Sequence, residues 1–194
     1  MPAILEAWFP GDHGGTAIAD ALFGEYNPGG KLSVTFPKSA GQIPFNFPTK
    51  PNAQWEGEKS RVNGALYTFG HGLSYTTFEY ANLRVTPQRI PVGGNVEVSV
   101  DVRNTGRVAG DEVVQLYTRD VVGSVTTYEK NLRGFERIHL APGQRRTVRF
   151  RLGPEDLALW NRQMRRVVEP GAFKVMVGSG SEDIRQQGGF EVQP

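Results

Sequence analysis

Residues 64–78 read Gly-Ala-Leu-Tyr-Thr-Phe-Gly-His-Gly-Leu-Ser-Tyr-Thr-Thr-Phe, and they separate two parts of the chain with different sequence patterns. Before Gly64 the pattern is that of a strand, a helix and long loops, and after Phe78 it is that of short strands joined by turns. The stretch contains three glycines and four aromatic residues. A flexible linker is rich in Gly and Ser and lacks large apolar side chains. We therefore predict a folded connector that packs against the segments on both sides.

The segment after this connector alternates apolar and polar residues, as strands with one buried face do. Pro154 marks the start of one short helix, on which Leu157 and Trp160 are expected to share a face. Seven strands are predicted, near residues 78–86, 95–104, 112–119, 131–139, 145–152, 172–178 and 188–192. Strands of this number and length are typical of an immunoglobulin-like or fibronectin III-like sandwich. The fold class is therefore predicted to be mainly β, with the sandwich over residues 78–194.

The N-terminal segment carries a strand–helix–strand pattern. Ile4–Phe9 and Leu32–Phe36 read as strands, and residues 14–24 have helical spacing with Gly24 at the helix end. A parallel sheet needs helices on both faces and several neighbouring strands. We therefore expect residues 1–40 to be a β-α-β remnant at the C-terminal end of a larger α/β domain. Residues 41–77 are then the junction loop and the seam between the two domains.

An isolated remnant of this kind exposes the apolar faces of its strand and helix, which favours association. We therefore expect either self-association, with pairing of the Ile4–Phe9 strands, or a partner chain that covers the N-terminal segment.

Composition narrows the functional classes. The formal net charge of +2 over 194 residues is too small to indicate a nucleic-acid partner. No apolar run approaches the roughly 20 residues of a membrane span, so no membrane partner is expected. The N-terminus has no basic segment of the kind that begins a signal peptide, and the cellular location stays open. Cysteine is absent, which excludes disulfides and thiolate metal sites.

No cofactor is expected. The histidines His13, His71 and His139 are scattered, without the spacing of metal ligands. The glycines at 11, 14 and 15 do not complete the Gly-x-Gly-x-x-Gly pattern of dinucleotide sites.

Several motifs resemble the C-terminal part of the family 3 glycoside hydrolases. Gly110–Tyr117 and Leu132–Arg137 resemble the fibronectin type III-like domain that ends many of these enzymes. Ala7–Gly11 and Leu22–Leu32 resemble the end of the family's α/β sandwich domain, and Tyr67–Tyr75 is similar to the junction between the two. The similarity is to the bacterial β-glucosidase and β-xylosidase branch, whose members are often periplasmic or secreted.

The resemblance implies retaining hydrolysis of β-glycosides in a complete enzyme, by an Asp nucleophile on a (β/α)8 barrel and an acid/base Glu. Such a barrel takes about 250 residues. No residue of this chain matches either catalytic carboxylate, so no catalytic residue is predicted. We expect a scaffold portion of a β-glucosidase-like enzyme that meets a β-linked oligosaccharide or glucoside only in the complete enzyme. The alternative is a free-standing carbohydrate-binding or protein-interaction module.

Three residues are candidates for substrate contact. Asp12 and His13 follow a predicted strand at the end where ligands bind in open α/β sheets. The alternative for Asp12 is capping of the following helix through the amide of Gly14 or Gly15. Trp55, in the junction loop, is the third candidate.

Four more side chains, Tyr67, Phe69, His71 and Tyr75, are predicted to seal the seam, with stacking on a sugar as the alternative. A weaker alternative is a hydrolase of another class that uses Ser74 with His71. The Gly-x-Ser-x-Gly elbow of such enzymes is absent around Ser74.

Overall fold

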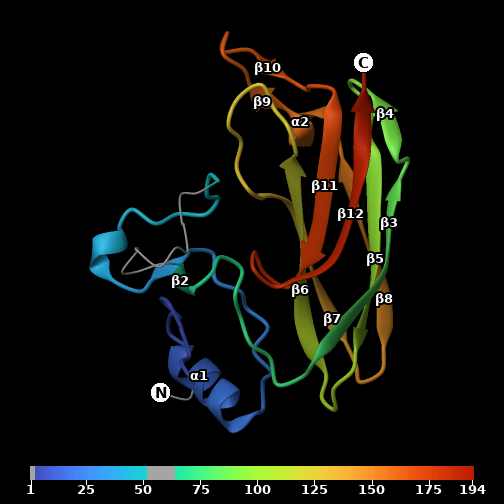
Figure 1. Cartoon of the computed structure of the whole chain (residues 1–194). Coiled ribbons are helices and arrows are strands. Elements are labelled where there is room, and N and C mark those ends of the chain that lie inside the picture. Colours follow the sequence, from blue (N-terminus) through green and yellow to red (C-terminus); the bar gives the residue numbers. More distant parts are fainter. Residues whose placement is uncertain (1–2, 52–63) are drawn as a thin grey trace.

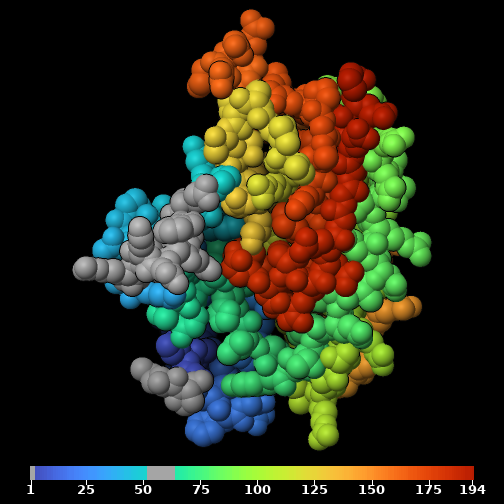
Figure 2. Space-filling view, viewed as in Figure 1, coloured from blue at the N-terminus to red at the C-terminus, as the bar shows by residue number. Residues whose placement is uncertain are grey.

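The computed structural model of the protein describes residues 3–51 and 64–194. Figure 1 shows a β-sandwich that holds the C-terminal part of the chain, with an N-terminal segment of helix and loops beside it. In the space-filling view this N-terminal segment packs directly against the sandwich (Figure 2). Within the described ranges, no helix is long and apolar enough to cross a membrane.

The sandwich consists of a five-stranded sheet, in the order β4-β12-β11-β6-β7, and a three-stranded sheet, in the order β3-β5-β8. The strands are β3 (Phe78–Thr86), β4 (Arg89–Pro91), β5 (Val96–Asn104), β6 (Gly110–Asp120), β7 (Asn131–Leu140), β8 (Arg145–Leu152), β11 (Gly171–Gly178) and β12 (Ile184–Gln193). The mainly β sandwich is confirmed, and each of the seven predicted strands is present. β4 is an additional short strand, which pairs in parallel with β12.

The core lies between the two sheets and follows from the period-two pattern. Val96, Val98, Val100 and Val102 point from β5 into the sandwich, and each is at most 1% exposed. The intervening residues of β5 face outward, because successive side chains of a strand point to opposite faces. The opposite sheet contributes fully buried residues of β6, β7 and β11, among them Leu116, Leu140 and Val175.

Three short elements lie at the end of the sandwich that is remote from α1 in Figure 1. The helix α2 (Pro154–Leu157) begins at the predicted proline, and β9 (Leu159–Trp160) and β10 (Arg166–Val167) form a small hairpin. Leu157 is buried, but Trp160 is 59% exposed. The shared face predicted for these two residues is wrong, because the helix ends at Leu157 and Trp160 lies in β9.

The N-terminal segment contains α1 (Gly14–Phe23), β1 (Phe36–Pro37), a 3-10 turn (Ala40–Gln42) and β2 (Ala65–Tyr67). The predicted helix is present and ends at Gly24, whose φ is +86°. Of the predicted strand Leu32–Phe36, only Phe36 is in a strand, which pairs antiparallel with β2. Residues 3–9 form no strand and pair with none of the described strands, although the Trp8 ring lies 6.3 Å from that of Phe36. A strand needs a paired neighbour for its backbone hydrogen bonds.

Candidate functional site

The seam is the region where residues 26–32 and 67–76 lie against the sandwich. Its backbone is tied in two places, since the Leu32 amide donates to the His71 carbonyl (2.8 Å) and the Gly70 amide donates to the Leu32 carbonyl (2.7 Å). Gly70 has a φ of +79°, which favours glycine. A β-carbon at this position would lie 2.3 Å from Oε1 of Gln115. The turn at Gly70 is therefore fitted to this sandwich side chain.

Gln115 of β6 joins the turn to the sandwich. It is 3% exposed, and its Nε2 donates to the carbonyls of Ser179 (2.8 Å) and Gly70 (3.3 Å). Its Oε1 accepts a short hydrogen bond from the Tyr117 hydroxyl. Buried amides are costly unless hydrogen-bonded, so a residue with this many partners fixes the position of the turn. Burial raises the pKa of Tyr117, and that phenol stays neutral and available as a donor.

A buried ion pair lies beside this turn. Lys31 Nζ is 3.7 Å from Oε1 of Glu112, and the two side chains are 9% and 3% exposed. Lys31 Nζ also donates to Ser179 Oγ (2.7 Å) and to the Gly72 carbonyl (3.2 Å). The Tyr80 hydroxyl donates to the same Glu112 oxygen (2.8 Å). Burial first, and the charge of Glu112 second, raise the pKa of Tyr80 far above its usual value, so this hydroxyl keeps its proton.

Asn27 makes a third connection across the seam, through side-chain hydrogen bonds. Its Nδ2 donates to the Ala109 carbonyl (2.9 Å), and its Oδ1 accepts from the Ser74 hydroxyl (3.0 Å) and the Tyr75 amide (2.8 Å). The Ser74 hydroxyl is therefore engaged in holding the connector. His71 lies against Tyr67, with ring centroids 5.3 Å apart. These contacts give Ser74 and His71 structural roles and form no Ser–His nucleophile pair.

An exposed hydrogen bond connects Tyr26 of the N-terminal segment to β7 of the sandwich. Its hydroxyl accepts from an Arg137 nitrogen (2.9 Å), and Arg137 also pairs with Asp111. His139 Nδ1 is 2.6 Å from the other oxygen of Asp111. Burial acts to raise the pKa of Asp111, but the hydrogen bonds from His139 and Arg137 outweigh it and hold that pKa below its usual value.

The four predicted seam aromatics lie in three different contacts. Phe69 stacks on Phe47 with centroids 4.5 Å apart, and Tyr67 and His71 stack on each other. The Tyr75 hydroxyl donates to the Ala21 carbonyl of α1 (2.7 Å), although the side chain is 55% exposed. Among the described residues, neither a ring contact nor a side-chain hydrogen bond joins Tyr75 to the other three.

The predicted substrate residues are not brought together with the seam. Asp12 and His13 lie in the exposed turn before α1. His13, not Asp12, is the residue before the first helical position, and no side chain caps this helix. The capping role for Asp12 is therefore wrong, because the turn places the Gly14 amide against the Gly11 carbonyl instead (3.0 Å). Trp55 lies outside the described residues.

Sequence reasoning gave no role to Lys31, Glu112, Gln115 or Asn27, which hold the seam together. Lys31 and Glu112 belong to motifs that resemble a known family, but a motif does not tell which distant residue its side chain meets. In residues 3–51 and 64–194, no group of three or more His, Asp or Glu side chains is arranged to hold a metal.

Comparison with known proteins gives two family models that match different parts of the chain. The Glycosyl hydrolase family 3 C-terminal domain matches residues 1–75, and the Fibronectin type III-like domain matches residues 112–181.

Two curated relatives match nearly the whole chain. A periplasmic β-glucosidase of Salmonella typhimurium is 46% identical over 98% of this chain and 26% of its own length. A β-xylosidase of Formosa agariphila is 44% identical over 94% of this chain and 26% of its own length. The chain therefore spans about a quarter of the length of these relatives.

Solved structures of β-glucosidases superpose on nearly the whole chain. A β-glucosidase from Erythrobacter marinus superposes with a TM-score of 0.93 at 42% identity, over 99% of this chain and 25% of that one. A β-glucosidase from Listeria innocua, solved in complex with glucose, gives 0.90 at 36% identity, over 97% of this chain and 28% of that one.

Proposed function

We propose that this chain, which corresponds to the C-terminal portion of the family 3 glycoside hydrolases, is the scaffold part of a β-glycosidase and is not catalytic by itself. In the complete enzyme the reaction is the retaining hydrolysis of β-glycosides. β-Glucosides are the first substrate class to test, since the relatives that match the chain include β-glucosidases from several organisms.

The observation that carries the scaffold role is the construction of the seam. The Lys31 side chain is bound by a hydrogen bond to Ser179, which follows β11, and by an ion pair to Glu112 of β6, and the Gly70 carbonyl accepts a hydrogen bond from Gln115 of β6. Networks in which every polar group has a partner make a region rigid. A seam of this kind holds the family 3 C-terminal domain and the fibronectin type III-like domain in one fixed orientation.

An activity assay of the isolated chain tests the proposal directly, and no turnover is expected. Retaining hydrolysis requires two carboxyl groups about 5–5.5 Å apart around the sugar. The purified 194-residue chain is therefore expected to leave nitrophenyl β-glucoside and nitrophenyl β-xyloside intact. Turnover well above that of a mock preparation from the same host would refute the proposal. A Ser74→Ala variant with reduced turnover would then point to the alternative serine chemistry.

Asp12, His13 and Trp55 are proposed to contribute to the rim of the active site in the complete enzyme. The exposed position of Asp12 and His13 leaves both side chains available for such a contact. In a complete enzyme that carries this C-terminal portion, Asp12→Asn and Trp55→Ala should raise KM for a β-glucoside. An unchanged KM in both variants would remove these residues from the rim.

The apolar surface of the N-terminal segment supports a further part of the proposal, namely that this segment is covered by another protein surface. Ile4, Phe9, Leu22 and Phe23 are between 61% and 100% exposed. Patches of this kind mark interaction sites or association. The isolated chain should therefore sediment as a dimer or larger species, and Phe9→Ser with Phe23→Ser should shift it toward monomer. A monomer at high protein concentration would contradict this.

A further inference from the structure

A hollow of about 300 Å³ lies beside the hairpin β9–β10, outside the seam. Its walls come from the loop that joins β6 to β7, from α2 and β9, and from Lys50 of the N-terminal segment. The Glu129 amide of that loop donates to the Thr49 carbonyl (2.9 Å), which connects the segment carrying Lys50 to the loop. The hollow is therefore built from segments distant in sequence, and its volume is at the lower end of the range of small-ligand sites.

Arg133 and Asp156 both line the hollow, and they are not paired with each other. The Arg133 Nε donates to Thr118 Oγ1 (3.3 Å), and Asp156 Oδ2 accepts a hydrogen bond from the Gly153 amide at the start of α2 (2.8 Å). Among the described residues, no other hydrogen bond and no ion pair engages either side chain. The terminal nitrogens of Arg133 and Oδ1 of Asp156 are therefore open to a ligand or to water.

The other two charged residues of the lining add little to this pair. Lys50 is exposed, so water solvates its ammonium group. Asp120 Oδ2 is shielded from solvent and therefore offers no acceptor to a ligand in the hollow. The two groups that remain, Arg133 and Asp156, carry opposite charges. A ligand with a net charge would be attracted by one of them and repelled by the other, so the pair favours an uncharged ligand that both donates and accepts hydrogen bonds.

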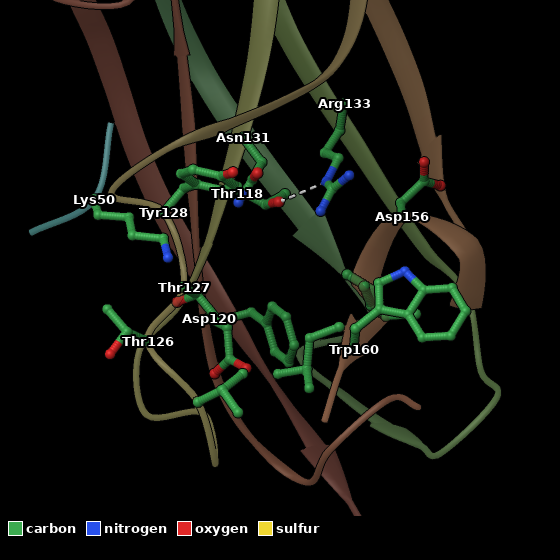
Figure 3. Close-up of a pocket in the computed structure, with 15 residues that line it drawn as sticks. Lys50, Thr118, Asp120, Thr126, Thr127, Tyr128, Asn131, Arg133, Asp156 and Trp160 are labelled. Atoms are coloured by element: carbon green, nitrogen blue, oxygen red, sulfur yellow. Dashed lines mark hydrogen bonds between the residues drawn. The ribbon is translucent and has the colours of Figure 1, made fainter. Parts of the chain in front are cut away.

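Trp160 adds an apolar surface to these polar groups. In Figure 3 its indole lies below Arg133 and Asp156, and 59% of the residue is exposed. Tyr128, which is 41% exposed, and Thr126 come from the loop between β6 and β7. Aromatic side chains beside a few polar groups are the usual lining of small-ligand sites. A pyranose ring presents C–H groups on its face, and each of its hydroxyl groups both donates and accepts a hydrogen bond.

We propose that this hollow binds an uncharged sugar residue. One sugar hydroxyl lies between Arg133 and Asp156, where it accepts from the guanidinium group and donates to the carboxylate, and the face of the ring lies against Trp160. An apolar ring would leave Arg133 and Asp156 without a partner, and an acyclic polyol would leave the indole uncovered. The site lies outside the seam and does not depend on the scaffold function, because a chain can bind a sugar without hydrolysing it.

The test uses three probes: methyl β-D-glucoside, tetrahydropyran, which is the ring without hydroxyl groups, and glycine betaine, which has both charges without hydroxyl groups. Binding is followed in ¹⁵N–¹H spectra of the full chain through the indole signal of Trp160, which Trp160→Ala assigns among the three tryptophans. The glucoside should shift this signal with a Kd on the order of 1 mM, and the other two probes should leave it in place. The Kd should be the same at low and high salt, since salt screens only interactions between charges.

Variants of the two charged residues test the contacts directly. Asp156→Asn keeps an oxygen for the Gly153 amide but removes the charge, and Arg133→Gln removes the guanidinium group. Each should weaken glucoside binding about tenfold, because a hydrogen bond to a charged group is lost. Glu155→Gln is the matched control, since Glu155 is the preceding residue of α2 and does not line the hollow, and its Kd should equal that of wild type. If Arg133→Gln does not fold, the comparison of Asp156→Asn with Glu155→Gln still decides.

The exposed position of Trp160 means that Trp160→Ala stays folded, and saturation transfer from this variant to the glucoside should fall to background. Three results would overturn the proposal: no glucoside shift at Trp160, an equal shift with tetrahydropyran or betaine, or an Asp156→Asn variant that binds as well as Glu155→Gln. A glucoside shift confined to the indole of Trp55 would also overturn it, while supporting the proposed contact of Trp55 with substrate. Absence of turnover bears only on the scaffold function.

Discussion

Replacing Lys31 by methionine removes the cation beside Glu112, and we expect the free energy of unfolding to fall by about 3 kcal/mol. Removing one partner of a buried ion pair costs roughly 3–5 kcal/mol, because the other charge stays buried without compensation. The lower end applies here, since the Tyr80 hydroxyl remains bound to Glu112. The hydrogen bonds from Lys31 to Ser179 and Gly72 are lost as well.

Urea unfolding monitored by tryptophan fluorescence measures this loss. With a slope of about 2 kcal/mol per molar urea, a loss of about 3 kcal/mol lowers the midpoint by about 1.5 M. The second variant, Lys31→Met with Glu112→Gln, removes the buried charge but keeps an oxygen for the Tyr80 hydroxyl. Most of the lost stability should return in this double variant, because the uncompensated charge is gone.

Lys174→Met is the matched control, since Lys174 is exposed on β11 and its loss should change stability by less than about 0.5 kcal/mol. A Lys31→Met midpoint equal to that of the control would show that the ion pair does not stabilise the seam. A double variant as unstable as the single one would show that the cost lies in lost packing of the lysine side chain and not in the stranded charge.

Three further predictions concern single positions. Gly70→Ala should destabilise the chain by about 1–3 kcal/mol, because φ is positive and the new methyl group meets Gln115, and a midpoint like that of wild type would contradict the fitted turn. Asp111→Asn should lower stability at neutral pH but not in strong acid. The pKa of Asp111 is depressed in the folded state, so its contribution is present above the unfolded pKa of about 3.9 and is lost as pH falls through the lower folded value. A difference from wild type that does not depend on pH would refute this. Asp120→Asn should raise stability at neutral pH, since burial raises the pKa of Asp120 and disfavours its carboxylate there, and this gain should vanish in acid, where the carboxyl is protonated in both the folded and the unfolded chain. Thermal unfolding of variant and wild type at neutral and at acid pH measures this difference. A variant less stable than wild type at neutral pH would refute the prediction.

Much of the sandwich was predictable from sequence because its signal is local. The alternating valines of β5 report one buried face, and glycine-containing turns mark where strands end. The N-terminal segment was less predictable. Residues 3–9 have the composition of a strand but form none: a strand also requires backbone pairing with a neighbour, and these residues pair with none of the described strands. Trp160 shows the same limit on a smaller scale, since the helix before it ends as soon as β9 begins pairing with β10.

The sequence by itself determined the sandwich, the connector at residues 64–78 and the resemblance to the family 3 glycoside hydrolases. These rest on periodicity, on turn residues and on motifs that can be recognised along the chain. Only the tertiary structure decided that Lys31 meets Glu112, that Gln115 packs against the turn at Gly70, and that Lys50 and Arg133, distant in sequence, line the same hollow. A local period shows which face of an element is buried, but it does not show which distant side chain that face meets. These contacts between distant side chains depend on how the sheets and loops pack in three dimensions.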